Sequence, residues 1–331
     1  MIPILSVLDQ SFTRKADQAH AAFQDTIAAA KHCEALGYHR FWVSEHHASN
    51  IIAGSAPEIL LAAIGAHTQR IRIGSGGVML PHYSAYKVAE VFSVLANLYP
   101  GRVDCGVGRA PGTDMSTARA LAKDGKPDFY QFPQQVQQLC SYLWDSDASP
   151  MLRPKPPEAI PVWCLGSSPD SAQLAAEQGL PYNIALFINP NINPELISAY
   201  RQHFQPSEHC PEPRVIVSVS VLCHDDELAL KRLEHTADVN YLRFFAEGGR
   251  AEFLSPDDAA TVRLSDRDRT VLHSVLKGRI SGTPDQVCER LVSVAQQYQA
   301  EELMLVTNTY DVQDKLDSFE RVAKAMSTFG R

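Results

Sequence analysis

The sequence predicts an α/β fold, a single (β/α)8 barrel of the TIM type, on three observations. Short runs of β-branched and other apolar residues alternate with amphipathic stretches over nearly the whole chain. Eight strand-like runs occur, each followed by helical sequence, which implies parallel strands joined by right-handed crossovers. Eight such units are the number that closes a barrel, and an open, doubly wound sheet is the alternative.

The strands and helices are expected at regular intervals along the chain. The strands fall at 2–9, 40–45, 70–78, 102–108, 161–166, 182–186, 214–223 and 301–308, and the helices at 16–37, 56–68, 85–98, 131–145, 169–178, 194–204, 284–299 and 313–327. Gly37, Gly179 and Pro100-Gly101 follow three of the helical stretches, which is typical of helix ends.

One segment is too long for a plain barrel connection. Residues 224–280, from HDDELALKRLEHT to VLKGRIS, mix helical stretches with FFAEGGRAEF and LSPDDAATVRLSDRDR. Long connections in compact domains are usually functional. We therefore expect an insertion between the seventh and eighth strands that lies over the barrel mouth and acts as a lid, with a solvated helical elaboration as the alternative. Residues 1–331 are expected to form one TIM-barrel domain that includes this insertion.

Composition excludes several classes of protein. The 331 residues carry 30 Lys and Arg against 38 Asp and Glu, a formal charge of −8, which favours neither nucleic acid nor an anionic membrane as a partner. No apolar run approaches the roughly 18 residues of a membrane span, and the first residues show no signal-peptide pattern. Seven scattered cysteines without a C-x-x-C pattern suit reduced thiols in the cytoplasm.

The stretch Glu45-His46-His47 ends the second predicted strand with three titratable groups. Neighbouring strand residues point to opposite faces, so both histidines enter one pocket only if the strand has already ended. No H-x-H or H-E-x-x-H pattern is present, which disfavours a metal site. An acid/base histidine suits proton transfer near neutral pH, and Glu45 could orient either this histidine or its neighbour. Hydrogen-bonded histidines without a catalytic role are the alternative.

Two further stretches could bind a phosphate. In CLGSSPDSAQ (164–173), Gly166 permits close backbone approach and Ser168 can cap a helix whose amides would hold an anion. Asp170 could occupy the same amides, so a well-capped helix without a ligand is equally consistent. DCGVGRAPG (104–112) is not a dinucleotide fingerprint, because Pro111 makes it a loop. Arg109, which leaves the fourth strand there, could pair with a phosphate or with a surface carboxylate.

The stretch IGSGGVMLPHY (73–83) has three glycines at the end of the third predicted strand. Glycine at such a position indicates either a flat ligand against the backbone, such as a cofactor ring, or tight barrel packing.

Four motifs in chain order together resemble the bacterial luciferase-like flavin monooxygenases. They are EHH (45–47), GSGGVMLP (74–81), GRVDCGVGRAPG (101–112) and GSSPDSAQLAAEQGLP (166–181). The resemblance is closest to the single-chain "luciferase family oxidoreductase, group 1" members, which include MsnO-type enzymes, and it extends through SGTPDQV (281–287) and the last strand.

The resemblance implies a TIM barrel that binds reduced FMN (FMNH2) at its mouth, usually as a homodimer. A separate NAD(P)H-dependent flavin reductase would supply the FMNH2. Oxygen (O2) would add at flavin carbon 4a, and the peroxide would oxygenate a small organic substrate. His46 matches the catalytic histidine of the family, and no metal ligand is implied.

The resemblance also implies which residues bind the cofactor. Arg109 matches a phosphate-binding arginine, and Gly166, Ser167 and Ser168 fall where the family cradles the phosphate. Gly76-Gly77 matches the pair joined by a non-prolyl cis peptide beneath the flavin ring. The cofactor-binding residues are therefore expected to be Gly76, Gly77, Arg109, Gly166, Ser167 and Ser168.

The chain departs from the family at two positions. Gly108 replaces the reactive cysteine of luciferase catalytic subunits, so no thiol chemistry is expected there. HYSAY (82–86) replaces the usual His-Ser-Pro, so local substrate contacts of His82 and Tyr83 do not carry over. Residues 8–11, 82–86 and 240–275 are expected to shape the substrate pocket.

Three other functions stay open at this point. A deazaflavin-dependent hydride-transfer oxidoreductase would use the same barrel, and a non-catalytic flavin-binding protein would keep the fold alone. A metal-dependent hydrolase would need Glu45, His46 and His47 to converge.

Overall fold

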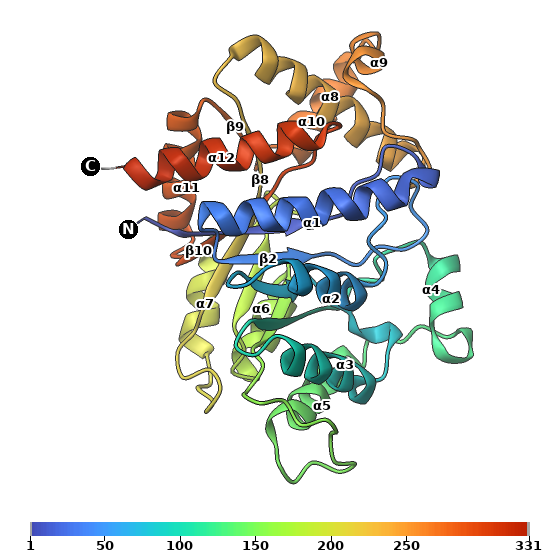
Figure 1. The fold of residues 1–331 in the computed structure, drawn as a ribbon, viewed down its shortest axis with the longest axis vertical. Helices are drawn as coiled ribbons and strands as arrows, with labels where there is room; N and C mark the ends of the chain where they lie inside the picture. The colour runs from blue at the N-terminus through green and yellow to red at the C-terminus, as the bar shows by residue number, and fades with distance from the viewer. Residues whose placement is uncertain (1, 330–331) are drawn as a thin grey trace.

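A computed structural model describes residues 2–329, in which eight parallel strands close into a barrel (Figure 1). The last barrel strand pairs with both the first strand and the seventh, so the sheet has no open edge at this point and the open-sheet alternative is wrong. The barrel strands are β1 (Ile4–Asp9), β2 (Arg40–Val43), β3 (Arg72–Ser75), β5 (Val103–Gly108), β6 (Val162–Gly166), β7 (Tyr182–Ala185), β8 (Val215–Cys223) and β10 (Glu302–Val306).

Two short strands were not expected as separate elements. The predicted strand 70–78 is divided, because the chain turns at a cis peptide bond between Gly76 and Gly77 before β4 (Val78–Met79) pairs with β5. β9 (Ile280–Gly282), at the end of the predicted insertion, pairs with the last residues of β8. β8 has nine residues and is longer than its neighbours, so its end projects beyond the barrel and accepts this extra strand.

Eight helices cover the outside of the barrel, as predicted, and all of them except the last return the chain to the start of a further strand. They are α1 (Ala19–Leu36), α2 (Pro57–His67), α3 (Ala85–Leu98), α5 (Phe132–Trp144), α6 (Pro169–Glu177), α7 (Glu195–His203), α11 (Pro284–Gln297) and α12 (Val312–Thr328). The helix expected at 16–37 begins instead with a 3-10 turn, η1 (Ala16–Gln18), and a short helix, α4 (Met115–Leu121), was not expected at all.

The insertion between the seventh and eighth barrel strands is helical. It contains α8 (Glu227–Ala246), α9 (Pro256–Ala260) and α10 (Asp266–Val275), which lie together beside α12 at the top of Figure 1. Each of the three helices begins at an Asp or Ser whose side chain accepts a hydrogen bond from a first-turn amide, which fixes where it starts. After α8 the chain crosses toward the loops that follow β1 and β2.

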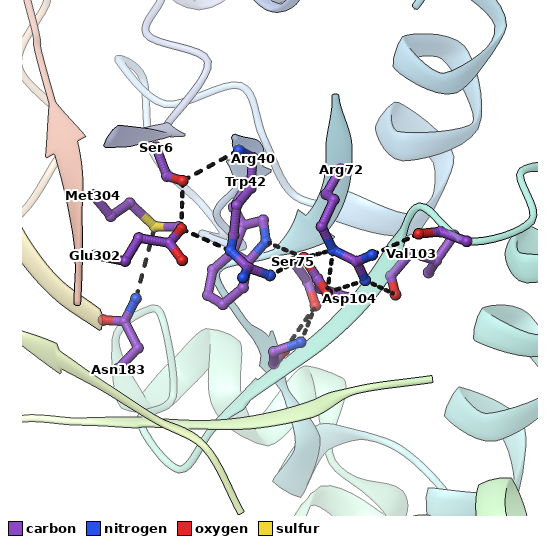
Figure 2. Close-up of polar contacts among 12 residues, drawn as sticks. Ser6, Arg40, Trp42, Arg72, Ser75, Val103, Asp104, Asn183, Glu302 and Met304 are labelled. Atoms are coloured by element: carbon purple, nitrogen blue, oxygen red, sulfur yellow. Dashed lines mark hydrogen bonds and ion pairs between the residues drawn. The ribbon is translucent and has the colours of Figure 1, made fainter. Parts of the chain in front are cut away.

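The barrel interior is layered from its N-terminal end to its mouth. At the N-terminal end, Arg40 donates to Asp104 at 2.8 Å and to Glu302 at 2.7 Å, and Arg72 donates to Asp104 at 2.6 Å (Figure 2). Above these charges lies an apolar cluster of Leu8, Trp42, Trp163, Ile216, Met304 and Val306. The polar residues that follow the strands form the third layer, at the mouth.

Candidate active site

His46 lies at the barrel mouth, three residues beyond the end of β2. Its Nε2 is 3.4 Å from Nε2 of Gln10, which follows β1, and Oε1 of Gln10 accepts a hydrogen bond from Asn308 at 2.9 Å. Burial lowers the pKa of His46, while the backbone of Gly112 acts in the opposite direction. The ring is therefore neutral near pH 7, the form that can accept a proton.

Glu45 orients the neighbouring histidine rather than His46. Its buried carboxylate accepts hydrogen bonds from His47 at 2.8 Å, from the Tyr83 hydroxyl at 2.8 Å and from the Met79 amide at 2.9 Å. These three contacts join the ends of β2 and β4 to the start of α3. The sequence left open which histidine Glu45 serves, and the structure assigns it to His47.

Glu45, His46 and His47 do not converge on a common point, since Glu45 and His47 contact each other and His46 turns to Gln10. Within residues 2–329, no group of three or more His, Cys, Asp and Glu side chains could hold a metal ion. This geometry gives no support to a metal-dependent hydrolase.

Arg109 lies close to the start of α6, one residue beyond β5. Its guanidinium is 3.8 Å from the carboxylate of Asp170 in the first turn of that helix. Both side chains are largely exposed, at 51% and 77% of their surface, so the pair is loose and water competes for it. The structure thus brings together the arginine and the helix start that the sequence singled out separately.

The start of α6 is a tight, hydroxyl-rich turn. Ser168 and Ser171 form a capping box, and the Ser171 hydroxyl also contacts the Tyr182 hydroxyl at 2.9 Å. A side chain at position 166 would place its Cβ 2.1 Å from the Ser171 oxygen, so only glycine fits. The Ser167 carbonyl accepts from Asn189 at 3.4 Å, and its side chain is half-buried at the mouth.

The Gly76-Gly77 pair lies where β3 ends, and its peptide bond is cis, as the resemblance implies. A Cβ at position 76 would meet Leu8 at 2.6 Å, and one at 77 would meet the Gly106 carbonyl at 2.8 Å. Tight barrel packing, the alternative raised from the sequence, therefore accounts for both glycines without a ligand. Gly76 also lies directly above the apolar cluster that fills the barrel below the mouth.

His82 and Tyr83 are held by the rim itself. His82 contacts the Pro111 carbonyl at 2.8 Å, and its Nδ1 is buried without a hydrogen-bond partner.

All seven cysteines are free, buried thiols, and burial raises the pKa of Cys164, close to Arg109, to about 12. A thiolate near the candidate site is therefore disfavoured, in line with the glycine at position 108.

Two hollows that are open to solvent lie beside the insertion, at the ends of β1 and β10. One of about 220 Å³ is lined by Asn308 and by Thr236, Phe253 and Pro256 of the insertion. The other, of about 450 Å³, lies between the start of α1, Tyr310 and Phe253. The insertion thus contributes walls next to the rim residue Asn308, from Phe253 and Pro256 inside the range 240–275 and from Thr236 outside it.

Sequence reasoning did not single out Gln10 and Asn308 as partners of His46. Gln10 fell within the range 8–11 assigned to the substrate pocket, but Asn308 carried no motif. The signal that could have found both is their place directly after neighbouring strands, because β10, β1 and β2 are adjacent in the barrel.

Eight parallel strands with polar residues gathered at their carboxyl ends define a barrel enzyme that works at its mouth. The chain belongs to the luciferase-like monooxygenase family, whose model matches residues 5–301. It is an enzyme of the flavin-dependent monooxygenase class.

Relatives match almost their whole length. The chain is 42% identical to the protein YwcH of Bacillus subtilis (strain 168), over 98% of this chain and 99% of that one. It is 34% identical to the N-acetyl-S-alkylcysteine monooxygenase of the same organism, over 97% and 98% of the two chains. The solved structure of apo-MsnO8 is 36% identical and superposes with a TM-score of 0.91, over 99% of this chain and 100% of that one.

One feature of the described chain bears on membranes: among residues 2–329, no helix is both long enough and apolar enough to span a bilayer.

Proposed function

We propose that the protein binds reduced FMN across the barrel mouth and uses O2 to oxygenate a small organic substrate. The observation that carries the proposal is the position of Arg109 against the first turn of α6, which offers a guanidinium and a helix start to one phosphate. Bound reduced FMN supplies the electrons with which one atom of O2 enters the substrate while the other leaves as water.

The residues present fit the phosphate of FMN. Ser167 and Ser168 bring hydroxyl groups to the start of α6, and among the residues that the structure describes Arg109 has Asp170, at 3.8 Å, as its ion-pair partner. A phosphate dianion at this point would attract the guanidinium more strongly than a single exposed carboxylate does. Asp170 therefore takes the place of the ligand anion in the free protein.

The residues present also fit a flat ring. Beneath Gly76 and Gly77 the barrel is filled by the apolar cluster around Leu8 and Trp42, so water cannot approach the ring from below. The proposed lid, residues 224–280, would exclude water from above. A protected site suits oxygen chemistry because water diverts reactive intermediates.

His46 is proposed as the catalytic residue, a neutral imidazole that takes or returns a proton during oxygen transfer. Its lowered pKa keeps it unprotonated at neutral pH, and general acid/base groups raise reaction rates roughly 10²- to 10⁴-fold.

Support for FMN comes from a 3,6-diketocamphane monooxygenase component solved with FMN, which shares the fold with a TM-score of 0.73 at 19% identity.

The proposal includes a separate NAD(P)H-dependent reductase as the source of FMNH2, a cytoplasmic location, which the seven free thiols favour, and a homodimer. Ile59 on α2 and Val94 and Leu98 on the adjacent α3 are exposed apolar side chains that would suit a subunit contact. Sedimentation of the chain as a 36.5 kDa monomer at assay concentration would remove the dimer from the proposal.

His46→Ala tests the proposed function. With FMNH2 generated by an added reductase and candidate substrates, we expect the product that gains one oxygen atom to fall at least about 100-fold. FMN affinity should change less than about twofold, since His46 is assigned to proton transfer rather than to binding. His67→Ala, at an exposed position on α2, is the matched control.

Retention of product formation by His46→Ala would contradict the assignment. The deazaflavin alternative is tested with the same protein, because an F420-dependent secondary alcohol dehydrogenase shares the fold with a TM-score of 0.63 at 16% identity. Substrate reduction by reduced deazaflavin, with no oxygenated product formed when FMNH2 and air are supplied, would favour that alternative.

A further inference from the structure

We propose that Gln10 is a positioning residue for His46: held by Asn308, it donates to Nε2 of the imidazole and so places the proton of neutral His46 on Nδ1. The inference deepens the proposed function, because it rests on His46 as the proton-transfer group. It concerns the free protein, however, and can be tested without any cofactor.

The hydrogen-bond roles follow from the two contacts of one amide group. Asn308 donates from Nδ2 to Oε1 of Gln10 at 2.9 Å, so the oxygen of Gln10 is turned toward Asn308. The Gln10 amide nitrogen then faces Nε2 of His46 at 3.4 Å. An amide nitrogen donates and does not accept, so Nε2 must present its lone pair, and the single proton of the neutral ring lies on Nδ1.

The backbone at these positions is held firmly. Gln10 is buried and follows Asp9, whose carboxylate pairs with the buried Lys315 at 2.7 Å and accepts from the Ser11 amide at 2.7 Å. Asn308 follows Thr307, whose hydroxyl donates to the Val221 carbonyl at 2.9 Å. The side-chain amides of Gln10 and Asn308 can therefore still rotate, while the backbone that carries them is fixed. We call the hydrogen-bonded chain Asn308–Gln10–His46 the relay.

Competing groups near His46 are occupied elsewhere. The titratable side chains that act on it, Glu45 and His47, are joined to each other at 2.8 Å. The backbone of Gly112 favours a proton on the ring, which agrees with a proton on the nitrogen that does not face Gln10. With the proton on Nδ1, the basic lone pair of neutral His46 is on Nε2 and faces Gln10, so protonation of this nitrogen requires the Gln10 amide to turn its oxygen toward the ring.

A change at Asn308 should reach His46 through Gln10 without touching the ring. In Asn308→Asp the carboxylate only accepts, so Gln10 must turn its NH2 group toward residue 308 and its oxygen toward His46. His46 would then carry its proton on Nε2. Gln10→Glu should give the same tautomer by placing an acceptor directly beside Nε2.

The test is the two-bond ¹⁵N–¹H NMR spectrum of the ¹⁵N-histidine-labelled protein, recorded where His46 is neutral. The His46 signals are assigned by their loss in His46→Asn. We expect the Nδ1–H pattern in the wild type and the Nε2–H pattern in Asn308→Asp and in Gln10→Glu. Asn97→Asp, at an exposed amide on α3 far from the mouth, should keep the wild-type pattern.

An Nε2–H pattern in the wild type, or an unchanged tautomer in both Asn308→Asp and Gln10→Glu, would overturn the proposal. If one variant does not fold, the other still decides. Tautomers as expected together with full activity of His46→Ala would leave the relay intact and refute the catalytic role. Tautomers other than those expected, together with loss of activity in His46→Ala, would refute the role of Gln10 and leave the catalytic role of His46 standing.

Discussion

Arg109 and Asp170 form an ion pair that leaves both partners mostly in water. At 3.8 Å, and with more than half of each side chain exposed, the pair contributes little to stability. The pair matters for binding because it lies at the start of α6, where a phosphate would replace the carboxylate of Asp170. Asp170 should therefore weaken binding of an anion that Arg109 strengthens.

Substitutions at these two positions should change FMN affinity in opposite directions. We expect Arg109→Met to weaken binding of FMN about tenfold, since it removes a charged hydrogen-bond donor at a partly exposed site. Asp170→Asn should strengthen binding, because it removes a competing anion. Fluorescence titration with FMN measures both effects.

Riboflavin, which has the ring but not the phosphate, is the control ligand, and neither substitution should change its affinity. Arg119→Met, at an arginine in the last turn of α4, is the control variant. Equal losses for FMN and riboflavin in Arg109→Met would place the phosphate elsewhere.

At the scale of elements, the insertion is tied to the mouth by a short connector, residues 247–255. The Gly249 carbonyl accepts from the Asn50 amide at 2.9 Å, and the Phe253 amide donates to the Arg14 carbonyl at 3.0 Å. Asn240 on α8 fixes the connector from the other side, accepting from the Leu254 amide at 2.7 Å and donating to its carbonyl at 3.1 Å. This buried amide sets how tightly the connector covers the loops after β1 and β2.

We expect Asn240→Ala to loosen the connector without unfolding the barrel. It leaves the Leu254 amide and carbonyl without their partners, so hydrogen exchange in residues 247–255 should increase. If the connector helps to exclude water, hydrogen peroxide released per FMNH2 consumed should rise as well. Asn97→Ala, which removes a similar pair of contacts from α3 to the Ser93 and Lys155 carbonyls, should do neither.

Unchanged exchange in Asn240→Ala would show that the aromatic contacts of Phe253 hold the connector instead. Faster exchange with unchanged peroxide release would separate the connector from water exclusion and refute the lid.

Long, strongly patterned elements could be predicted, and short ones could not. The alternation of apolar strands with helical stretches reports burial along each element, so all eight barrel strands were found within a few residues. β9 and α4 were not predicted because elements of three and seven residues are too short to show a hydrophobic periodicity, and both depend on partners distant in sequence. The division between β3 and β4 depends on a peptide geometry that sequence periodicity does not report.

At the scale of the whole molecule, a buried charge network joins four strands at the N-terminal end of the barrel. Two arginines balance two carboxylates, Asp104 and Glu302, with Arg40 between them (Figure 2). Burial alone raises the pKa of Asp104, but Arg40 and Arg72 outweigh this effect and hold it below its ordinary value. The network shows how distant parts of the chain meet, since 262 positions separate Arg40 from Glu302.

Arg40→Met should destabilise the protein by about 3–5 kcal/mol, because it leaves Glu302 buried without a cation. Urea unfolding measures the change, and Lys231→Met, in an exposed pair with Glu227, should leave the midpoint where it was. The lowered pKa of Asp104 adds stability above about pH 4 that is lost as the pH falls further. Without Arg40 this acid-side loss should become shallower, and an unchanged acid profile would argue against the assignment.

Such long-range pairs explain why the site was predicted only in part. His46, Arg109 and the start of α6 each follow a strand and carry a local motif, so the strand order alone brings them to one face. The contacts of Gln10 and Asn308 depend on the orientation of their two side-chain amides. The contact of Glu45 depends on which of the two neighbouring histidines comes within 3 Å of its carboxylate. Barrel closure and side-chain packing determine these choices, and neither has a counterpart in a linear pattern.

The chain enters the barrel at the beginning of β1 and leaves it at the end of α12, and each of these points lies at the floor of the barrel (Figure 1). Affinity tags or fused proteins joined near Ile4 or Thr328 would thus project away from the proposed site at the mouth. A reductase tethered there by a short linker could not hand its product directly to the opening on the far side, so such a fusion should behave like two unlinked enzymes that exchange flavin through the solvent.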